Sequence, residues 1–190
     1  MTAAVPAGAP VRDAVLSRRS RPKVTDASPA DAELEMLLQA ASRVADHAAL
    51  APWRVIALRG RARARLGDAF VAASGFDGPA ALALAAKPLR APLLLAVVAA
   101  PRPHPKVPAW EQEACAAGVG HTLELLLDEA GWGVMWRTGP FTRHPEVARM
   151  HALAEHEHLM GWLYVGGRLE SERPPRRASD PARGRFSVLG

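Results

Sequence analysis

The sequence has a single cysteine and no long apolar run, and both shortages limit what the protein can be. Cys115 has no second cysteine in the chain to pair with, so an intrachain disulfide is excluded and a reducing compartment is expected. The longest aliphatic run, residues 92–100, is far shorter than the roughly 18 to 20 apolar residues that span a bilayer. The N-terminus lacks the charged and apolar regions of a secretory signal. We therefore predict a cytoplasmic protein without a membrane-spanning segment.

The composition predicts one compact domain over residues 1–190. Hydrophobic residues make up 49% of the 190 positions and charged residues 23%, which is typical of a globular chain. Residues 168–190 are rich in proline and arginine, and we expect them to form a basic tail without a core of its own. The formal charge of +5 suits nucleic acid, anionic lipid or a phosphorylated cofactor, and charge alone does not choose among these ligands.

Hydrophobic patterns predict helices and strands in a mixed order. Ser28 and Pro29 are placed as N-cap and first residue of a helix that continues to about residue 45. The most apolar helical pattern covers residues 109–131 and has Gly131 at its C-terminal end. Shorter helices are expected near residues 9–20 and 144–155, and strands at residues 53–59, 93–99, 132–136 and 159–166. We predict an α+β layered domain with a central mixed sheet of about four to five strands flanked by helices.

Glycine-rich phosphate motifs are missing from the sequence. Residues 118–120 and 131–133 each hold Gly-x-Gly, but neither has the third glycine or follows a strand into a helix. A phosphate group would therefore have to be held by side chains.

A basic cluster at residues 17–23 offers such side chains. It contains Arg18, Arg19 and Ser20, and arginine presents a planar set of donors that matches phosphate oxygens. The same cluster could instead be a solvated helix end that complements the helix dipole. The residues by themselves leave both interpretations open.

The histidines and the cysteine do not form a recognisable metal or nucleophile site. The C-terminal histidines lack the spacing of known ligand motifs, so we expect them on the surface; they are His144, His151, His156 and His158. Cys115 lies in an apolar helical pattern, which predicts a buried, inert thiol.

Four segments together resemble the FMN-dependent nitroreductase family in its small form. They are residues 18–20, 41–58, 106–113 and 131–139, and the resemblance extends over about residues 12–168. It implies an intertwined homodimer with two FMN sites at the subunit interface, each built from both chains. A helix that is apolar on every side between residues 114 and 127 fits such an interface.

The resemblance also implies which residues bind the cofactors. Arg18, Arg19 and Ser20 would contact FMN from one subunit, with Arg18 and Ser20 at its phosphate. Arg43 and His47 would reach the same FMN from the other subunit. Trp136, Arg137 and Thr138 would complete the pocket, while Trp132 would stay in the core. Contacts to NADH or NADPH are implied at Leu126, Leu127, Asp128, Glu129, Ala130 and Gly131.

The activity implied by this resemblance is transfer of a hydride from NAD(P)H through the flavin to an electron-poor acceptor such as a nitroaromatic or a quinone. No protein residue is assigned as catalytic. Relatives often carry Asn and Gln before the Pro-Trp pair, where this chain has Ala49 and Ala51, and the roles of Arg21 and Lys23 are open. Two alternatives are an FMN-binding protein without turnover, and a nucleic-acid or acidic-partner binder that uses the basic tail.

Overall fold

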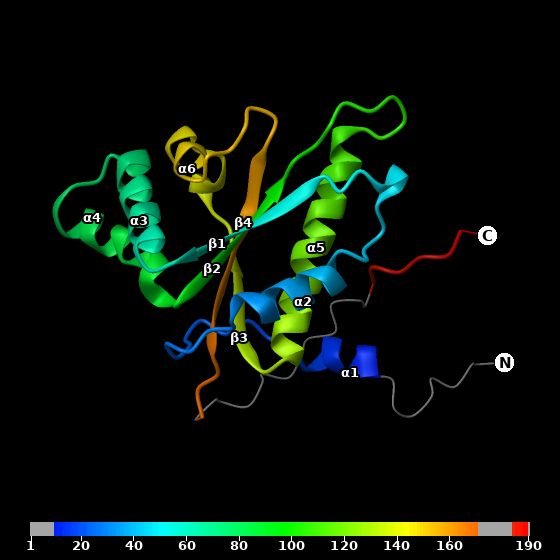
Figure 1. The fold of residues 1–190 in the computed structure, drawn as a ribbon, viewed down its shortest axis with the longest axis horizontal. Coiled ribbons are helices and arrows are strands. Elements are labelled where there is room, and N and C mark those ends of the chain that lie inside the picture. Colours follow the sequence, from blue (N-terminus) through cyan, green and yellow to red (C-terminus); the bar gives the residue numbers. More distant parts are fainter. Residues whose placement is uncertain (1–9, 171–183, 190) are drawn as a thin grey trace.

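A computed structural model describes residues 10–170 and 184–189. Its centre is a four-stranded sheet in the order β1-β2-β4-β3, with helices on both faces (Figure 1). The strands are β1 (Trp53–Arg59), β2 (Leu93–Ala99), β3 (Trp132–Arg137) and β4 (His158–Gly167). The predicted α+β layered architecture is confirmed.

The sheet differs from the prediction in being antiparallel rather than mixed. Every pairing among the described strands is antiparallel. Strands β2 and β3 run in the same direction and are joined through the long helix α5 (Ala109–Glu129), as in a parallel crossover unit. Strand β4 lies between them, however, so the two parallel strands are not neighbours.

The two faces of the sheet carry separate cores, and β2 contributes to both. Leu94, Ala96 and Val98 belong to one core, whereas Leu93, Leu95 and Val97 belong to the other. Because successive side chains of a strand point to opposite faces, a central strand covered on both sides is apolar at every position. This explains the unbroken aliphatic run that the sequence shows here.

Different helices cover the two faces of the sheet (Figure 1). Helix α5 packs on the face of Leu95 and Val97, with α2 beside it, and α3 covers the opposite face with α6. The remaining bounds are α1 (Pro10–Ser17), α2 (Asp31–Ala41), α3 (Arg61–Ser74), α4 (Gly78–Ala85), α6 (Pro145–Met150), η1 (His47–Ala49), η2 (Lys87–Arg90) and η3 (Pro140–Arg143), the last three being 3-10 helices.

Helix α2 begins later than the sequence predicts. Its N-cap is Ala30, without a side-chain capping bond, and not Ser28. The Ser28 hydroxyl instead accepts a hydrogen bond of 2.8 Å from Arg59 Nη1, at the end of β1. The Ser28 side chain, which the local sequence predicts as the helix cap, therefore makes a tertiary contact instead. The end of α5 agrees with the prediction, since Gly131 follows it with a φ of 92°.

Helix α1 buries none of its residues within the single chain. The large apolar residues of this helix, Val11, Val15 and Leu16, are all exposed. The predicted tail lies mostly outside the described residues. Within the residues that the structure describes, no helix is both long enough and apolar enough to cross a membrane.

Candidate functional site

The basic segment that follows α1 lies against the edge strand β3. The backbone N–H of Arg21 donates to the carbonyl oxygen of Val134 at 2.8 Å. Val24 packs over Gly133 so closely that a Cβ on this glycine would lie 2.7 Å from the Val24 Cγ1 atom. A glycine is therefore required for this approach, and it anchors residues 18–24 beside the strand that ends in Trp136 and Arg137.

Arg21 and Asp128 form a buried ion pair that fixes this segment to the end of α5. Their residues are 8% and 5% exposed, and Arg21 Nη1 donates to Asp128 Oδ1. Arg168, just after β4, places Nη2 3.3 Å from the same oxygen. Arg21 is thus held in a structural cluster, whereas the side chain of Lys23 is exposed.

Arg18 also meets a buried acid of α5. Its Nη1 lies 3.4 Å from Oε1 of Glu124, which is almost fully buried, while the Arg18 side chain is about one-third exposed. A guanidinium has five N–H donors, so this contact leaves donors available for a ligand. Arg19 is half-buried and Ser20 is exposed. The segment is therefore organised by the fold, which differs from a freely solvated helix end.

The loop that carries His47 is shaped by Asp46. The Asp46 carboxylate accepts hydrogen bonds from the backbone N–H groups of Leu50 at 3.1 Å and of Ala51 at 2.7 Å. His47 Nδ1 lies 2.7 Å from Glu111 Oε1, and its side chain is half-exposed. Arg43 is exposed as well. Both side chains lie on the surface of the single chain, away from the cavity described next.

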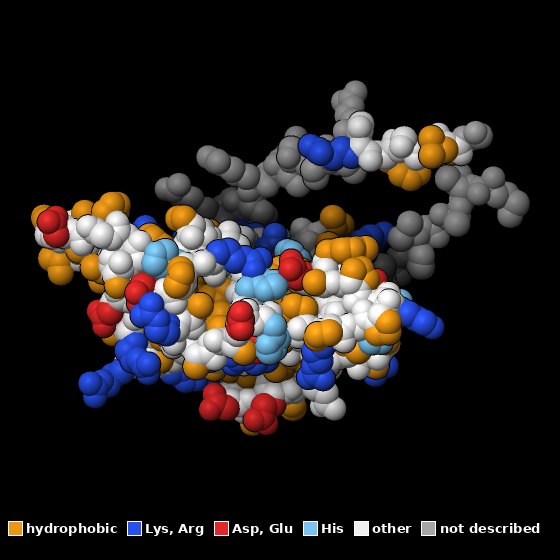
Figure 2. Space-filling view, turned by 90° about the horizontal axis from the view of Figure 1, so that it is seen from above, with side chains coloured by type: hydrophobic (Ala, Val, Ile, Leu, Met, Phe, Trp, Pro, Cys, Tyr) orange, Lys and Arg blue, Asp and Glu red, His pale blue; other side chains and the backbone are white. Residues whose placement is uncertain are grey.

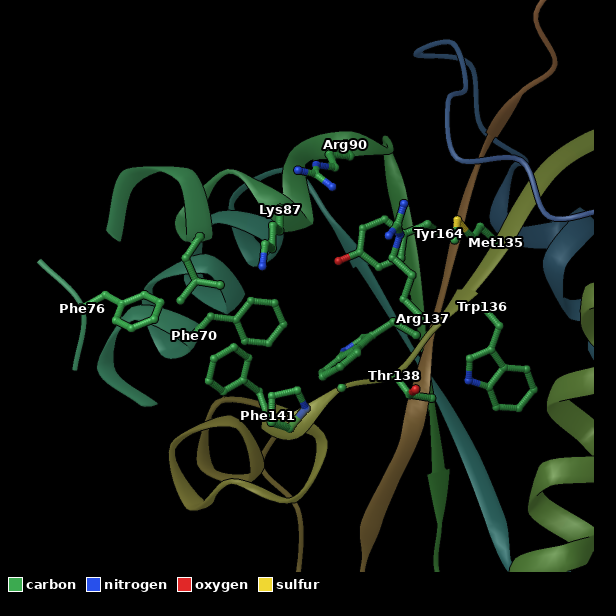
Figure 3. Close-up of a pocket in the computed structure, with 14 residues that line it drawn as sticks. Phe70, Phe76, Lys87, Arg90, Met135, Trp136, Arg137, Thr138, Phe141 and Tyr164 are labelled. Carbon is green, nitrogen blue, oxygen red and sulfur yellow. The ribbon is translucent and has the colours of Figure 1, made fainter. Parts of the chain in front are cut away.

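A cavity of about 660 Å³ lies at the end of β3, on the face of the sheet that carries α3 (Figure 3). Its backbone rim includes Thr138, Gly139 and Pro140. The aromatic residues that line it are Phe70, Phe76, Trp136, Phe141, Trp162 and Tyr164. The cationic ones are Lys87, Arg90 and Arg137. The volume is within the range of ligand sites.

The structure brings Trp136, Arg137 and Thr138 to this cavity, with their side chains in different directions. The Arg137 guanidinium lies over the Tyr164 ring, 5.2 Å from its centre. The Trp136 ring points to the α5 side of the sheet (Figure 3), where Nε1 donates to the Met160 carbonyl at 3.3 Å. Strand alternation causes this difference. Trp132 also packs against the core on the α5 side, as predicted.

The cavity is electrostatically positive. Its lining includes three cationic side chains and no acidic one. Among the described residues, none of these cations has a carboxylate partner, and Nε of Arg137 is buried without a hydrogen bond. Burial raises the pKa of Tyr164, and Arg137 and Arg90 oppose this rise. Tyr164 therefore remains a neutral phenol beside two guanidinium groups.

His151 supports the aromatic wall of the cavity from behind. It is buried, although the sequence analysis placed it on the surface, and this prediction was wrong. Trp162 Nε1 donates to His151 Nε2 at 3.1 Å, and His151 Nδ1 lies 2.8 Å from the Val147 carbonyl oxygen. A carbonyl only accepts, so Nδ1 carries a proton; an indole N–H only donates, so Nε2 carries none and the ring is neutral.

We expect His151 to make stability depend on pH. Burial is the largest influence and lowers the pKa of His151 below the ordinary 6.5. The hydrogen bond to the Val147 carbonyl raises this pKa, and the positive charge of Arg54 lowers it further. The stabilisation is fully present above about pH 6.5 and is lost as pH falls through the lowered pKa. Replacing His151 with Gln should make the free energy of unfolding, measured in urea between pH 7 and 5, less dependent on pH.

Glu157 does not obscure this test, because its hydrogen bond with Arg54 lowers its pKa to about 2 and its contribution is lost mainly below pH 5. His158, whose pKa is also lowered, first by burial, is present in both proteins and cancels. An unchanged pH dependence in the His151→Gln variant would contradict the assignment.

The other three C-terminal histidines and Cys115 differ in how far they are buried. His156 is exposed as expected, and His144 and His158 are half-buried. His144 Nδ1 accepts from the Glu146 N–H and caps α6, at 3.2 Å. Cys115 is buried, and burial, its largest influence, raises the pKa of the thiol. The described part of the chain holds no cluster of three or more His, Cys, Asp or Glu side chains suited to a metal.

The turn expected to bind the nicotinamide cofactor lies apart from this cavity. None of residues 126–131 lines it. Leu127 and Asp128 are buried inside the chain, and only Glu129, Ala130 and Gly131 are exposed. The assignment of this turn stays a prediction.

Several cavity residues were missed by the sequence analysis. Lys87 and Arg90 flank a proline just before the buried strand β2, and Tyr164 lies on β4 opposite Met135. Basic residues directly before a fully buried strand were a signal that could have been noticed. Phe70 and Phe141 carry no such signal, because an aromatic residue in a short helix is usually part of the core.

The fold and the cavity define an α+β domain suited to a flat aromatic ligand with anionic groups. The Nitroreductase family matches residues 15–167, and the chain belongs to this family. The expected nitroreductase-like fold and the oxidoreductase class are thereby confirmed.

Known proteins agree with this membership. An Escherichia coli K12 protein provisionally named NAD(P)H nitroreductase YdjA is 31% identical over 155 residues, 80% of this chain and 85% of that protein. A nitroreductase-like family protein from Bacillus cereus has a TM-score of 0.81 at 22% identity and covers 98% of this chain and 99% of its own. The FMN and NADPH-dependent nitroreductase NfnB from Sphigopyxis sp. strain HMH has a TM-score of 0.71 at 18% identity. The match covers 94% of this chain and 98% of that protein.

Proposed function

We propose that the chain is an FMN-dependent NAD(P)H oxidoreductase that reduces an electron-poor acceptor such as a nitroaromatic or a quinone. The observation that carries this proposal is the cavity at Trp136, Arg137 and Thr138, which combines aromatic walls with unpaired cations. Family membership and the names of the relatives support the same chemistry. Like the activity, the cytoplasmic location is our proposal.

The residues at the cavity fit FMN. Arg137 has a buried Nε without a hydrogen-bond partner among the described residues, and such a donor suits a ligand acceptor atom. Arg18, Arg19 and Ser20 do not line this cavity, and Arg18 lies beside Glu124 of α5. We assign these three residues to the phosphate group. The bound flavin would supply the hydride chemistry, while the protein sets its position and surroundings.

A homodimer would complete this site. Arg43 and His47 lie on the surface and outside the cavity of their own chain, as side chains that serve a second subunit would. Val15, Leu16 and Met36 are also exposed, on α1 and α2. Both helices contact α5, and large exposed apolar side chains on such elements favour an interface between copies of the chain. Analytical ultracentrifugation should give twice the chain mass.

The direct test is the visible spectrum of the purified, FMN-loaded protein after desalting. We expect flavin absorption bands to remain with the protein and to bleach when NADH or NADPH is added without oxygen. The more effective nucleotide is then the preferred reductant. Bands that persist with both nucleotides would favour an FMN-binding protein without turnover. A protein that loses its flavin on desalting would contradict the proposal.

Arg18 provides a test at the phosphate end. We expect Arg18→Ala to weaken FMN binding by about 1 to 3 kcal/mol, because a charge-assisted contact to a phosphate is lost. The dissociation constant is measured by flavin fluorescence titration. Lys23→Ala is the matched control, since it removes an exposed cation from the same segment and should change affinity little. Equal affinities of the wild type and the Arg18→Ala variant would remove Arg18 from the site.

A basic binder of nucleic acid is less well supported. On the face seen in Figure 2, Lys and Arg side chains are separated by acidic, histidine and apolar side chains and form no continuous basic surface. The tail on which this alternative depends falls largely outside the described residues. If it applied, affinity for nucleic acid would fall steeply with salt.

A further inference from the structure

The cavity has an aromatic end that is held together by ring contacts. Phe70 stacks on Phe141 with ring centres 5.2 Å apart, and the edge of Trp162 meets Phe70 at 5.4 Å. His151 fixes Trp162 through its indole N–H, as described above. Figure 3 shows the Phe70 and Phe141 rings together at one side of the cavity. A flat aromatic molecule would find ring faces and edges there.

The other end of the cavity is cationic and contains Tyr164, with Arg137 over its ring. Figure 3 shows Arg90 and Arg137 beside Tyr164, on the side of the cavity away from Phe141, and Lys87 between Tyr164 and Phe70. Lys87 and Arg90 are exposed at the mouth, and Arg137 is half-buried. Among residues 10–170 and 184–189, no acidic side chain lines the cavity and no carboxylate pairs with these cations. Cations without carboxylate partners that line one cavity favour an anionic group there.

We propose that the electron acceptor is a planar aromatic molecule that carries an anionic substituent, such as a carboxylate. Its ring would lie at the aromatic end, and its anionic group would meet Lys87 and Arg90. This inference rests on the proposed function, because the acceptor must enter the same cavity as the reduced cofactor. For a nitroaromatic acid, one NAD(P)H and one proton convert the nitro group to a nitroso group and release water and NAD(P)⁺.

Three ligands of nearly equal shape separate charge from size. Benzoate is anionic, benzamide is neutral and benzamidine is cationic at neutral pH, and none of them is reduced. We expect the FMN-loaded protein to bind benzoate about tenfold more tightly than benzamide, and benzamidine least tightly, by isothermal titration calorimetry. With NAD(P)H, 4-nitrobenzoate should have a lower KM than 4-nitrobenzamide. The amide is the stronger electron-withdrawing group, so chemical reactivity alone would favour the opposite order.

Arg90→Gln tests the residue that meets the anion, and Arg61→Gln is its control. Arg61 is an exposed arginine at the start of α3 that does not line the cavity, so both variants lose one positive charge. We expect Arg90→Gln to remove most of the benzoate preference and Arg61→Gln to retain it. An equal loss in both variants would indicate only the net charge of the protein and would overturn the proposal.

The remaining outcomes separate this inference from the function. Retained flavin and NAD(P)H oxidation without any benzoate preference would overturn the inference alone. So would an Arg90→Gln variant that binds FMN at least tenfold more weakly and keeps its acceptor preference, because the cations would then serve the cofactor. Loss of flavin from the wild type would overturn the proposed function, and the inference would fall with it.

Discussion

Replacing Asp128 with asparagine is expected to lower the free energy of unfolding by about 3 to 5 kcal/mol. Asn keeps the shape of the side chain but removes the charge that faces Arg21 and Arg168. The buried Arg21 guanidinium would then lose the negative charge of Asp128, and losing one partner of a buried ion pair is far more costly than losing one of an exposed pair. Urea unfolding followed by circular dichroism measures the change.

A pair at the surface provides the control. Asp31 lies 3.0 Å from Arg59 Nη2, but the Asp31 side chain is 79% exposed. Because solvent screens such a pair, Asp31→Asn should cost no more than about 1 kcal/mol. If the two variants lose the same free energy, the buried cluster is not the structural tie that we infer between α5, β4 and the segment after α1.

Gly161→Ala is expected to have the second large effect, on both stability and the cofactor site. Gly161 has a φ of 138°, and a Cβ there would lie 2.7 Å from the Arg137 carbonyl oxygen and 3.0 Å from Thr138 Cγ2. It would also collide with the Trp136 ring. Backbone strain and overpacking together should cost about 2 to 4 kcal/mol. The displaced residues 136–138 should also bind FMN more weakly, measured by fluorescence titration.

Gly118→Ala distinguishes this specific clash from a general effect of adding a methyl group. Gly118 lies within α5, and the nearest atoms to its Cβ would be those of Val44 at 3.6 Å, an ordinary contact distance. Alanine is favoured over glycine inside a helix, so this variant should be neutral or slightly more stable. Wild-type stability and FMN affinity in the Gly161→Ala variant would show that β4 tolerates a side chain beside Trp136.

The sheet shows which features of the fold a local sequence pattern predicts and which it does not. The strand at residues 53–59 and the strand at residues 93–99 were predicted with the bounds that the structure gives. Their order in the sheet was not, because pairing depends on where the chain returns, and β4 enters between β2 and β3. The same holds for Ser28, whose hydroxyl has a strong local preference for the helix cap but binds Arg59 across the fold.

The functional site shows the same difference between what local sequence predicts and what tertiary packing decides. The quoted segments sufficed to identify the family, while the assignment of Arg18, Arg137 and Thr138 to the cofactor stays a prediction. They could not show that Arg21 is buried with Asp128, or that Trp136 turns its ring toward α5 while Arg137 faces the cavity. Strand alternation fixes the relative sides of neighbouring residues, but only packing decides which side is the cavity.

The sequence alone therefore determined the fold class, the family and the residues expected to carry the cofactor, because apolar periodicity and short segments are local properties of the chain. The tertiary structure decided which cations remain unpaired. Arg18 and Arg21 meet buried acids from α5, more than a hundred residues away, whereas Lys87, Arg90 and Arg137 meet none among the described residues. Charge compensation is a contact between distant parts of the chain, and only the folded arrangement brings these parts together or keeps them apart.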